Sequence, residues 1–245
     1  MSAPPWFLAP PDRWSPTEVT LPEAESHHAL RVMRVSPPDV ITVVDGRGCV
    51  ARCSATRVEN DCLVAEILEM DQRRAPKPAV VVYQAVPKGT KADAIVERLA
   101  ELGVAEVWVF ESERAVARWD EAKIERLGSR WDAIAASAAK QSRNPFVLHA
   151  RAGLSWNELV AKVRDEQLPV VLWEEASLPL RTALIKGADR VALVVGPEGG
   201  FTQAEADALA EAGAQLASLG PRIVRTENAA LVAASALLFH YGAIG

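Results

Sequence analysis

Two glycine-bearing segments near the C-terminus have the composition of ligand-binding loops. Their sequences are VVGPEGGFT over residues 194–202 and LGPRIVRTEN over residues 219–228. Each follows a short apolar run and leads into a helical pattern, so each is expected at the carboxyl end of a strand, where open α/β sheets bind ligands. Glycine lets a backbone approach a ligand closely. The two segments therefore predict one site built largely from backbone groups.

The first loop lacks two common nucleotide-binding motifs. No Lys-Ser or Lys-Thr pair follows its glycines, as a P-loop requires, and the GxGxxG spacing of dinucleotide-binding folds is missing. Thr202 and Glu205 have the spacing of a capping box, which would start a helix just after the glycines. The alternative is a tight turn between a strand and a helix, with no ligand.

The second loop carries two cations. Gly220 and Pro221 favour a turn, and Arg222 and Arg225 follow it. Guanidinium groups suit phosphate and carboxylate ligands. The alternative is a solvated loop in which Arg225 pairs with Glu227.

Further polar side chains could contact an anionic partner. Lys88 and Lys91 lie where a strand gives way to a helix, and Gln141 and Arg143 lie at the end of a long helical pattern. Helix starts bind anions, whereas cations also favour helix ends for purely local reasons. Each pair is therefore compatible with a ligand contact or with a solvated helix end.

The remaining composition predicts an ordinary cytoplasmic protein. Cys49, Cys53 and Cys62 lack CxxC spacing and are expected to be reduced thiols, and no metal motif is present. The sequence starts without the pattern of a secretion signal and has no apolar run as long as a membrane span. The net charge of −5 argues against nonspecific binding of nucleic acid.

Strand, helix and linker signals predict two domains. Residues 1–72 are β-rich, with strands at 40–44, 50–58 and 63–68 and a short helix or loop at 27–35, and residues 73–78 have the charge and prolines of a linker. In residues 79–245, strands at 79–85, 104–110, 170–173, 191–195 and 216–219 alternate with helices at 90–102, 123–142, 155–163, 178–186, 202–212 and 227–241. This alternation predicts an α/β domain with a parallel sheet covered on both faces.

Six ordered segments resemble the ribosomal RNA small-subunit methyltransferase E family of the SPOUT superfamily. They are His27-His28 with Val32 and Arg34, Gln84-Ala85 with Lys88-Gly89, Lys91 and Asp93, residues 101–104, residues 138–143, residues 196–201, and residues 219–227. The family usually has Thr-Ala after the last of these, where this chain has Asn228-Ala229.

The resemblance implies a fold, a reaction and partners. The fold is a PUA-like β-barrel followed by a SPOUT domain with a deep trefoil knot. The reaction is N3-methylation of a uridine in small-subunit (16S) ribosomal RNA with S-adenosylmethionine (SAM), and the enzymes are homodimers. The acidic net charge favours rRNA in an assembled subunit as the substrate. The alternatives are a ribose 2′-O-methyltransferase of the same superfamily and a non-catalytic RNA-binding protein.

The resemblance also implies roles for individual residues. Arg225 would orient the uracil or stabilise its charge, and Glu198 or Glu227 is the weaker candidate for the base. The RNA contacts would be Arg31, Arg34, Lys88, Lys91, Gln141 and Arg143. The methyl donor would be held by Leu172, Trp173, Val195, Gly196, Glu198, Gly199, Gly200, Leu219, Gly220, Ile223, Val224, Arg225 and Thr226.

Overall fold

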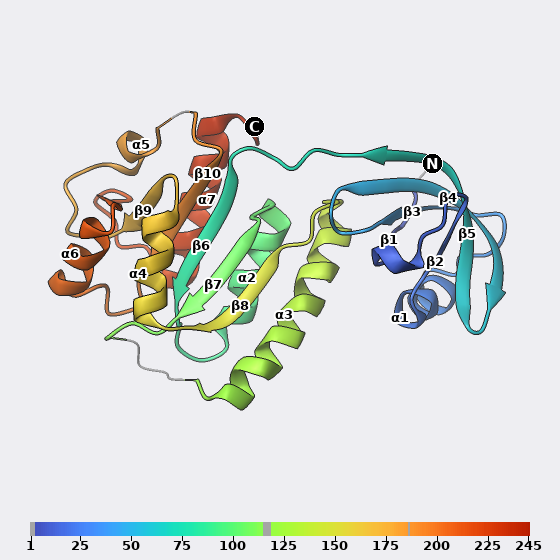
Figure 1. Ribbon diagram of the computed structural model, residues 1–245, viewed down its shortest axis with the longest axis horizontal. Coiled ribbons are helices and arrows are strands. Elements are labelled where there is room, and N and C mark those ends of the chain that lie inside the picture. Colours follow the sequence, from blue (N-terminus) through green and yellow to red (C-terminus); the bar gives the residue numbers. More distant parts are fainter. Residues whose placement is uncertain (1–2, 115–118, 186) are drawn as a thin grey trace. The chain divides into compact units, whose positions relative to one another are not determined.

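The computed structural model describes residues 3–114, 119–185 and 187–245. Two compact units are present, one of residues 1–75 with 139–147 and the other of residues 76–138 with 148–245. Figure 1 shows the elements of both units and their labels.

The first unit is built on a five-stranded sheet in the order β1-β3-β4-β5-β2. Its strands are β1 (Trp6–Leu8), β2 (Glu18–Thr20), β3 (Val40–Val44), β4 (Cys49–Glu59) and β5 (Cys62–Gln72), with a 3₁₀ turn at Pro11–Arg13. All neighbouring strands are antiparallel except β1 and β3. Helix α1 (Glu23–His27) continues as a π-helical turn (His28–Val32). The PUA-like closure of this sheet stays a prediction of the resemblance.

The first unit also contains a segment that the sequence placed in the second domain. Residues 139–147 belong to it because their backbone pairs with the turn after β3. The Gly48 amide donates to the Pro145 carbonyl at 3.1 Å, and the Val147 amide donates to the Gly46 carbonyl at 3.0 Å. Backbone pairing of this kind leaves no periodic sequence signal, so the expected 79–245 domain did not account for it.

The second unit contains a six-stranded parallel sheet in the order β11-β9-β10-β6-β7-β8. The strands are β6 (Ala79–Ala85), β7 (Glu106–Phe110), β8 (His149–Leu154), β9 (Pro169–Leu172), β10 (Arg190–Val195) and β11 (Gln215–Ala217). The helices are α2 (Lys91–Leu102), α3 (Glu121–Ser142), α4 (Trp156–Asp165), α5 (Leu180–Ala183), α6 (Gln203–Glu211) and α7 (Thr226–Tyr241); the last four residues of α3 belong to the first unit. The predicted parallel α/β sheet is confirmed, whereas the trefoil knot stays a prediction.

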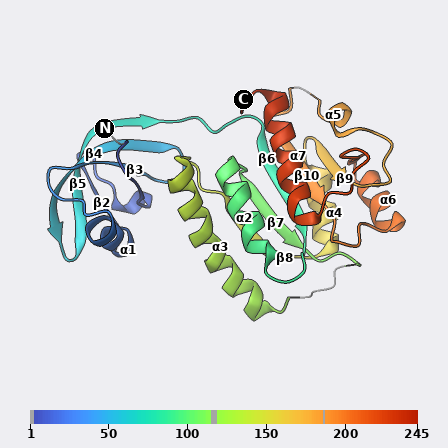
Figure 2. The same ribbon diagram turned by 180° about the vertical axis from the view of Figure 1, so that it is seen from behind.

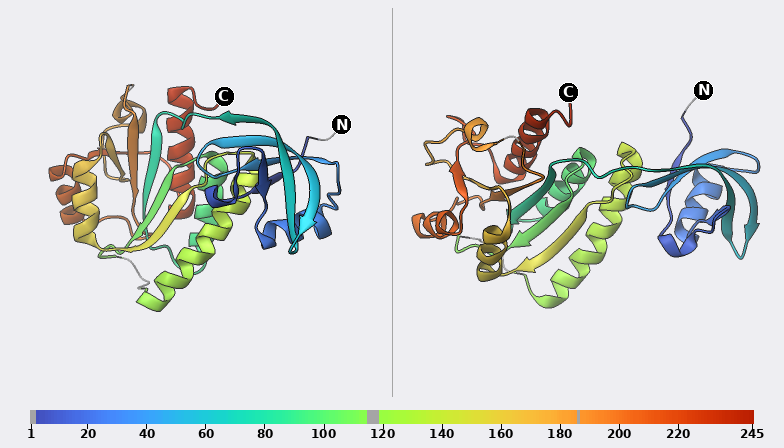
Figure 3. Two further views of the ribbon diagram at one scale, coloured as in Figure 1. Left: turned by 45° about the vertical axis from the view of Figure 1, so that its right-hand side comes forward. Right: turned by 45° about the horizontal axis from the view of Figure 1, so that its top comes forward.

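Helices cover both faces of this sheet because its central strands are apolar on both sides. Side chains such as Tyr83 and Val194 form one core with Leu159 of α4 and Leu209 of α6. Helix α7 packs on β10 and β6 on the opposite face, beside α2. Figures 1 and 2 show α4 on one side of the sheet and α2 with α7 on the other. The left view of Figure 3 again separates α4 and α6 from α7.

In the second unit one strand was not predicted and one predicted helix was too long. Strand β8 has the sequence HARAGL, and its polar residues and glycine hid it from a search for apolar runs. The helix expected over 178–186 spans only Leu180–Ala183, since Leu184 has extended backbone and a buried side chain. Lys186, the end of that expected helix, lies outside the described residues.

An ion-pair cluster lies at the amino ends of the strands, away from the glycine loops. Arg190 donates to Glu166 at 2.7 Å and to Glu106 at 2.9 Å. The Tyr83 hydroxyl also donates to Glu166, at 2.7 Å. Burial and this carboxylate raise the pKa of Tyr83, so the phenol stays protonated. These groups are satisfied by one another, which is typical of a structural cluster.

Candidate functional site

A cavity of about 320 Å³ lies at the carboxyl ends of β9 and β10 and beside the chain that follows β11. The end of β9 contributes Leu172, Trp173 and Glu174 to its lining. The chain after β10 contributes Val195, Gly196, Pro197, Glu198 and Gly200. The chain after β11 contributes Ser218, Leu219, Gly220, Arg222, Ile223, Val224, Arg225, Thr226, Glu227 and Ala229, and α2 contributes Lys91. Both glycine loops therefore line one cavity, as the sequence predicted.

The predicted donor-binding residues line this cavity with one exception. Gly199 is not among the lining residues. It is exposed, and its carbonyl accepts a hydrogen bond of 3.0 Å from Arg114. Glu174 lines the cavity but was not predicted. It directly follows a predicted strand end, which is the signal that could have found it.

The first loop is held by the capping box that starts α6. The Thr202 hydroxyl accepts from the Glu205 amide at 3.2 Å, and the Glu205 carboxylate accepts from the Thr202 amide at 2.8 Å. The other oxygen of Glu205 accepts from the Glu113 amide at 2.8 Å. Within the loop, the Gly200 amide donates to the Pro197 carbonyl at 3.0 Å. The loop therefore presents fixed backbone groups to the cavity.

The second loop is tied to the first through Thr226. The buried Thr226 hydroxyl donates to the Gly196 carbonyl at 2.6 Å. It also accepts from the side-chain amide of Gln84, at 2.9 Å. Gln84 is fully buried at the end of β6, so the bond lies where water cannot replace it. One hydroxyl thus links β6, the loop after β10 and the start of α7.

An ion-pair bridge crosses the cavity wall. The Lys91 ammonium lies 3.3 Å from Glu198 and 3.1 Å from Glu227, so it joins α2 to both loops. Glu198 also accepts from the Lys88 amide at 3.0 Å. Lys91 was expected to contact RNA, yet its ammonium is already paired with two carboxylates. The alternative pairing of Arg225 with Glu227 is not seen among the described residues.

Hydrogen bonds and charge lower the pKa of both carboxylates. For Glu198, burial raises the pKa, but the Lys88 amide, its own amide and Lys91 outweigh that effect. For Glu227, its own amide lowers the pKa most, burial opposes this, and Lys91 lowers it further. The pKa of Lys91 is raised, chiefly by its hydrogen bond to Glu227. All three groups are therefore charged at neutral pH.

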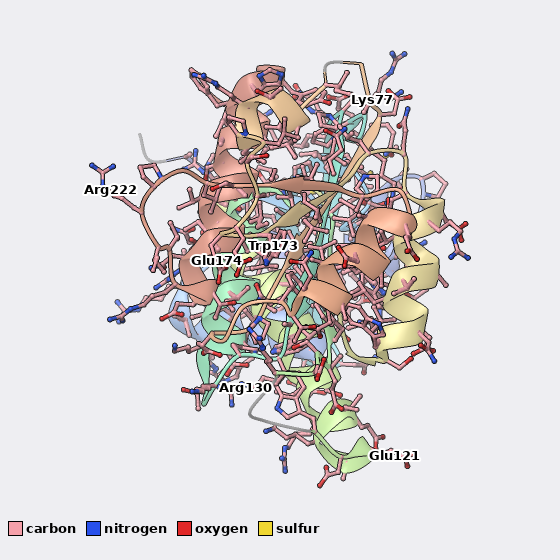
Figure 4. The ribbon with its side chains drawn as sticks, turned by 90° about the vertical axis from the view of Figure 1, so that its left-hand side faces the viewer. Lys77, Glu121, Arg130, Trp173, Glu174 and Arg222 are labelled. Carbon is pink, nitrogen blue, oxygen red and sulfur yellow. The ribbon has the colours of Figure 1, made fainter. Side chains whose placement is uncertain are left out.

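The arginines of the second loop face solvent. Arg225 is exposed at the N-cap of α7, where its carbonyl accepts from the Asn228 and Ala229 amides at 2.8 and 2.9 Å. Arg222 is also exposed, and in Figure 4 it points away from Trp173 and Glu174 at the outer edge of its loop. Ile223 between them is 94% exposed. Both guanidinium groups thus lie near the mouth of the cavity and away from its buried wall.

The predicted RNA contacts fall in both units. Arg31, Arg34, Gln141 and Arg143 are exposed in the first unit. Lys88 is exposed in the second unit, and Lys91 is partly buried there. Their part in RNA binding stays a prediction.

The described part of the chain contains neither a cluster of metal-ligating side chains nor a membrane-spanning helix. In residues 3–114, 119–185 and 187–245, no three His, Cys, Asp or Glu side chains gather as metal ligands would. The described helices include none that is long and apolar enough to cross a bilayer. The three cysteines are free thiols.

We expect Thr226→Val to lower the free energy of unfolding by about 1–3 kcal/mol. The valine methyl groups neither accept from Gln84 nor donate to the Gly196 carbonyl, so the buried Gln84 amide keeps only its bond to the Ala85 carbonyl and the Gly196 carbonyl loses its donor. Denaturant titration measures the effect, and Thr226→Ser, which keeps the hydroxyl, is the control. A valine variant as stable as the wild type would show that the hydroxyl does not hold the loops.

Comparisons with known proteins identify the family. The model of the RNA methyltransferase domain family matches residues 73–238. Ribosomal RNA small subunit methyltransferase E of Mycobacterium tuberculosis is 36% identical over 217 residues, which cover 87% of this chain and 83% of the relative. The Bacillus subtilis enzyme of that name is 33% identical, over 88% of this chain and 87% of its own length.

Solved structures that are similar to this chain lead to the same family. The crystal structure of ribosomal RNA small subunit methyltransferase E from Neisseria gonorrhoeae bound to S-adenosyl methionine is 30% identical, covers 98% of both chains and has a TM-score of 0.85. A Legionella pneumophila structure with bound SAM is 26% identical, covers 97% of this chain and 98% of its own, and has a TM-score of 0.87. The chain therefore belongs to the ribosomal RNA small subunit methyltransferase E family.

Proposed function

We propose that this protein transfers the methyl group of SAM to N3 of a uridine in 16S ribosomal RNA. The observation that carries the proposal is the single cavity formed by both glycine loops and the end of β9. Relatives of similar length are named as small-subunit rRNA methyltransferases, and one was solved with SAM bound.

The lining of the cavity fits SAM. Apolar side chains such as Leu172, Val195 and Val224 suit the adenine ring, and the backbone groups of the glycine loops suit its polar edge and the ribose. Glu174, Glu198 and Glu227 suit a ligand that carries positive charge. When bound, SAM supplies an activated methyl group, so the protein has to position the uridine and promote loss of its N3 proton.

Arg225 is the side chain proposed to act on the uracil. It is exposed beside the cavity at the first turn of α7, where the helix dipole also favours negative charge. Its guanidinium can donate to a uracil oxygen while N3 loses its proton. Glu198 and Glu227 are weaker candidates for the base because their lowered pKa values reduce their proton affinity.

The proposal extends to fold details, partners and location. We propose the PUA-like barrel for residues 1–72, which form most of the first unit, and the SPOUT knot for the second unit. We propose a homodimer, since Val232 and Phe239 of α7 expose apolar surface, as do Ile185 and Ile244. The acidic net charge favours rRNA in assembled subunits as the substrate. A ribosomal substrate also implies a cytoplasmic enzyme.

Nucleoside mass spectrometry of rRNA tests the reaction directly. Deleting the gene should abolish one N3-methyluridine in 16S rRNA, and restoring the gene should return it. Unchanged N3-methyluridine would contradict the proposal, and loss of a 2′-O-methylated nucleoside would point to the other SPOUT chemistry. Incubating the purified protein with assembled subunits or with naked 16S rRNA then shows which is the substrate.

Replacement of Arg225 should lower turnover far more than donor binding. We expect Arg225→Ala to reduce kcat by about 10²–10³-fold, the effect of losing one donor to a developing oxyanion, with little change in the Kd for SAM. Single-turnover methylation and calorimetry measure the two quantities, and Arg222→Ala is the matched control on the same loop. Lost SAM affinity with unchanged turnover would assign Arg225 to donor binding.

Two predicted RNA contacts adopt backbone that disfavours arginine. Arg34 and Arg143 both have φ of 56°, where glycine is favoured; Arg34 follows Met33, the C-cap of the π-helical turn, and Arg143 directly follows α3. Both are exposed in the first unit. The presence of arginine, and not glycine, at two positions with this unfavourable backbone supports a role for both side chains in RNA binding.

Glycine at either position should preserve or improve stability while weakening RNA binding. We expect Arg34→Gly and Arg143→Gly to raise the free energy of unfolding by up to about 1 kcal/mol. Each should also lower the salt dependence of RNA binding by about one counterion. Denaturant titration and RNA binding at several salt concentrations measure both effects, and the Lys variants, which keep the charge, are controls. RNA affinity unchanged in both glycine variants would refute the contacts.

A further inference from the structure

Glu174 lines the cavity and lies directly against the first glycine loop. It follows Trp173 directly after β9, and both line the cavity. In Figure 4 the two residues lie close together, on the part of the unit that faces the viewer. The Glu174 carboxylate packs against Gly200 of the first loop, because a Cβ atom at Gly200 would lie only 2.7 Å from Glu174 Oε1. The absence of a side chain at Gly200 makes room for this carboxylate.

The charge of Glu174 is not compensated by a neighbour. Glu198 and Glu227, the other carboxylates of the lining, share the Lys91 ammonium. Glu174 forms no ion pair in residues 3–114, 119–185 and 187–245, which are the residues described. Arg222 and Arg225 are exposed and do not pair with it. Arg222 and Arg225 also line the cavity, but no ion pair joins either of them to Glu174 among the described residues, so the negative charge of Glu174 is local to its edge of the cavity.

We propose that Glu174 makes the pocket prefer the positively charged methyl donor over its neutral product. This inference rests on the proposed function. During transfer, the bond between the methyl carbon and sulfur breaks and its electron pair stays on sulfur, while the carbon bonds to the deprotonated N3. The sulfonium of SAM thereby becomes the uncharged thioether of S-adenosylhomocysteine, and the rest of the ligand is unchanged. A fixed carboxylate attracts the positively charged sulfonium but not the uncharged thioether.

The expected effect is moderate because Glu174 is exposed at the edge of the cavity. A charge several ångströms away, in an environment of intermediate dielectric, changes an equilibrium constant by about tenfold. This charge effect favours turnover, because the attraction helps to capture SAM and disappears once the methyl group has left. Glu174 is therefore a specificity-determining residue that acts on binding and product release.

Calorimetry with SAM and S-adenosylhomocysteine tests this role. The quantity of interest is the ratio of their Kd values in the wild type and in Glu174→Gln, which keeps the shape and removes the charge. We expect the preference for SAM to fall about tenfold, with nearly unchanged affinity for S-adenosylhomocysteine. Glu175→Gln, the next position in the chain and absent from the lining, should leave the ratio unchanged.

Gly200→Ala provides a second variant. Its Cβ would displace the carboxylate, so the ratio should shift in the same direction as in Glu174→Gln. Equal loss of affinity for both ligands in Glu174→Gln would overturn the inference, because it would show that the carboxylate binds a group common to both. An unchanged ratio would overturn it as well. Failure of the wild-type protein to bind SAM at all would instead refute the proposed function.

Discussion

The Thr226 hydroxyl sets the geometry of the cavity. It donates to the Gly196 carbonyl and accepts from Gln84, so one oxygen fixes the start of α7 against the ends of β6 and β10. Buried polar groups lose free energy when they are separated from their partners. Neither glycine loop can therefore shift independently, although glycine gives each of them local freedom. The backbone freedom that glycine provides is therefore confined to the parts of each loop that lie between these hydrogen-bonded residues.

The charges of the cavity follow from this arrangement. With both loops fixed, Glu198 and Glu227 come close enough to share the Lys91 ammonium from α2. Glu174, directly after the residue that follows β9, lies against Gly200 and is not part of that bridge. The unit thus keeps one pair of carboxylates neutralised in part and leaves a third uncompensated. Which carboxylates are neutralised depends on where α2 begins, at Lys91, and where β9 ends, just before Trp173 and Glu174.

Local signals in the sequence predicted the loops, but contacts between distant segments had to come from the structure. Glycines, capping boxes and apolar runs depend on neighbouring residues, and all the donor-binding residues predicted from the sequence except Gly199 line the cavity. The Lys91 bridge joins residues 107 and more positions apart, and the pairing of residues 139–147 with the first unit has no periodic pattern. Glu174 was missed because its place against the first loop depends on the absence of a side chain at Gly200, which lies far from it in the sequence.

Attraction of the donor and acceleration of methyl transfer are separate tasks for this cavity. The proposed reaction brings a cationic sulfonium to a deprotonated nitrogen, and both charges vanish as the methyl group moves. Groups that bind those charges stabilise the bound reactants more than the transition state, so their attraction alone does not raise kcat. The carboxylates are therefore suited to capture and release of the donor. The acceleration has to come from positioning of the uridine and from loss of its proton, and this requirement falls on groups at the mouth of the cavity, Arg225 among them.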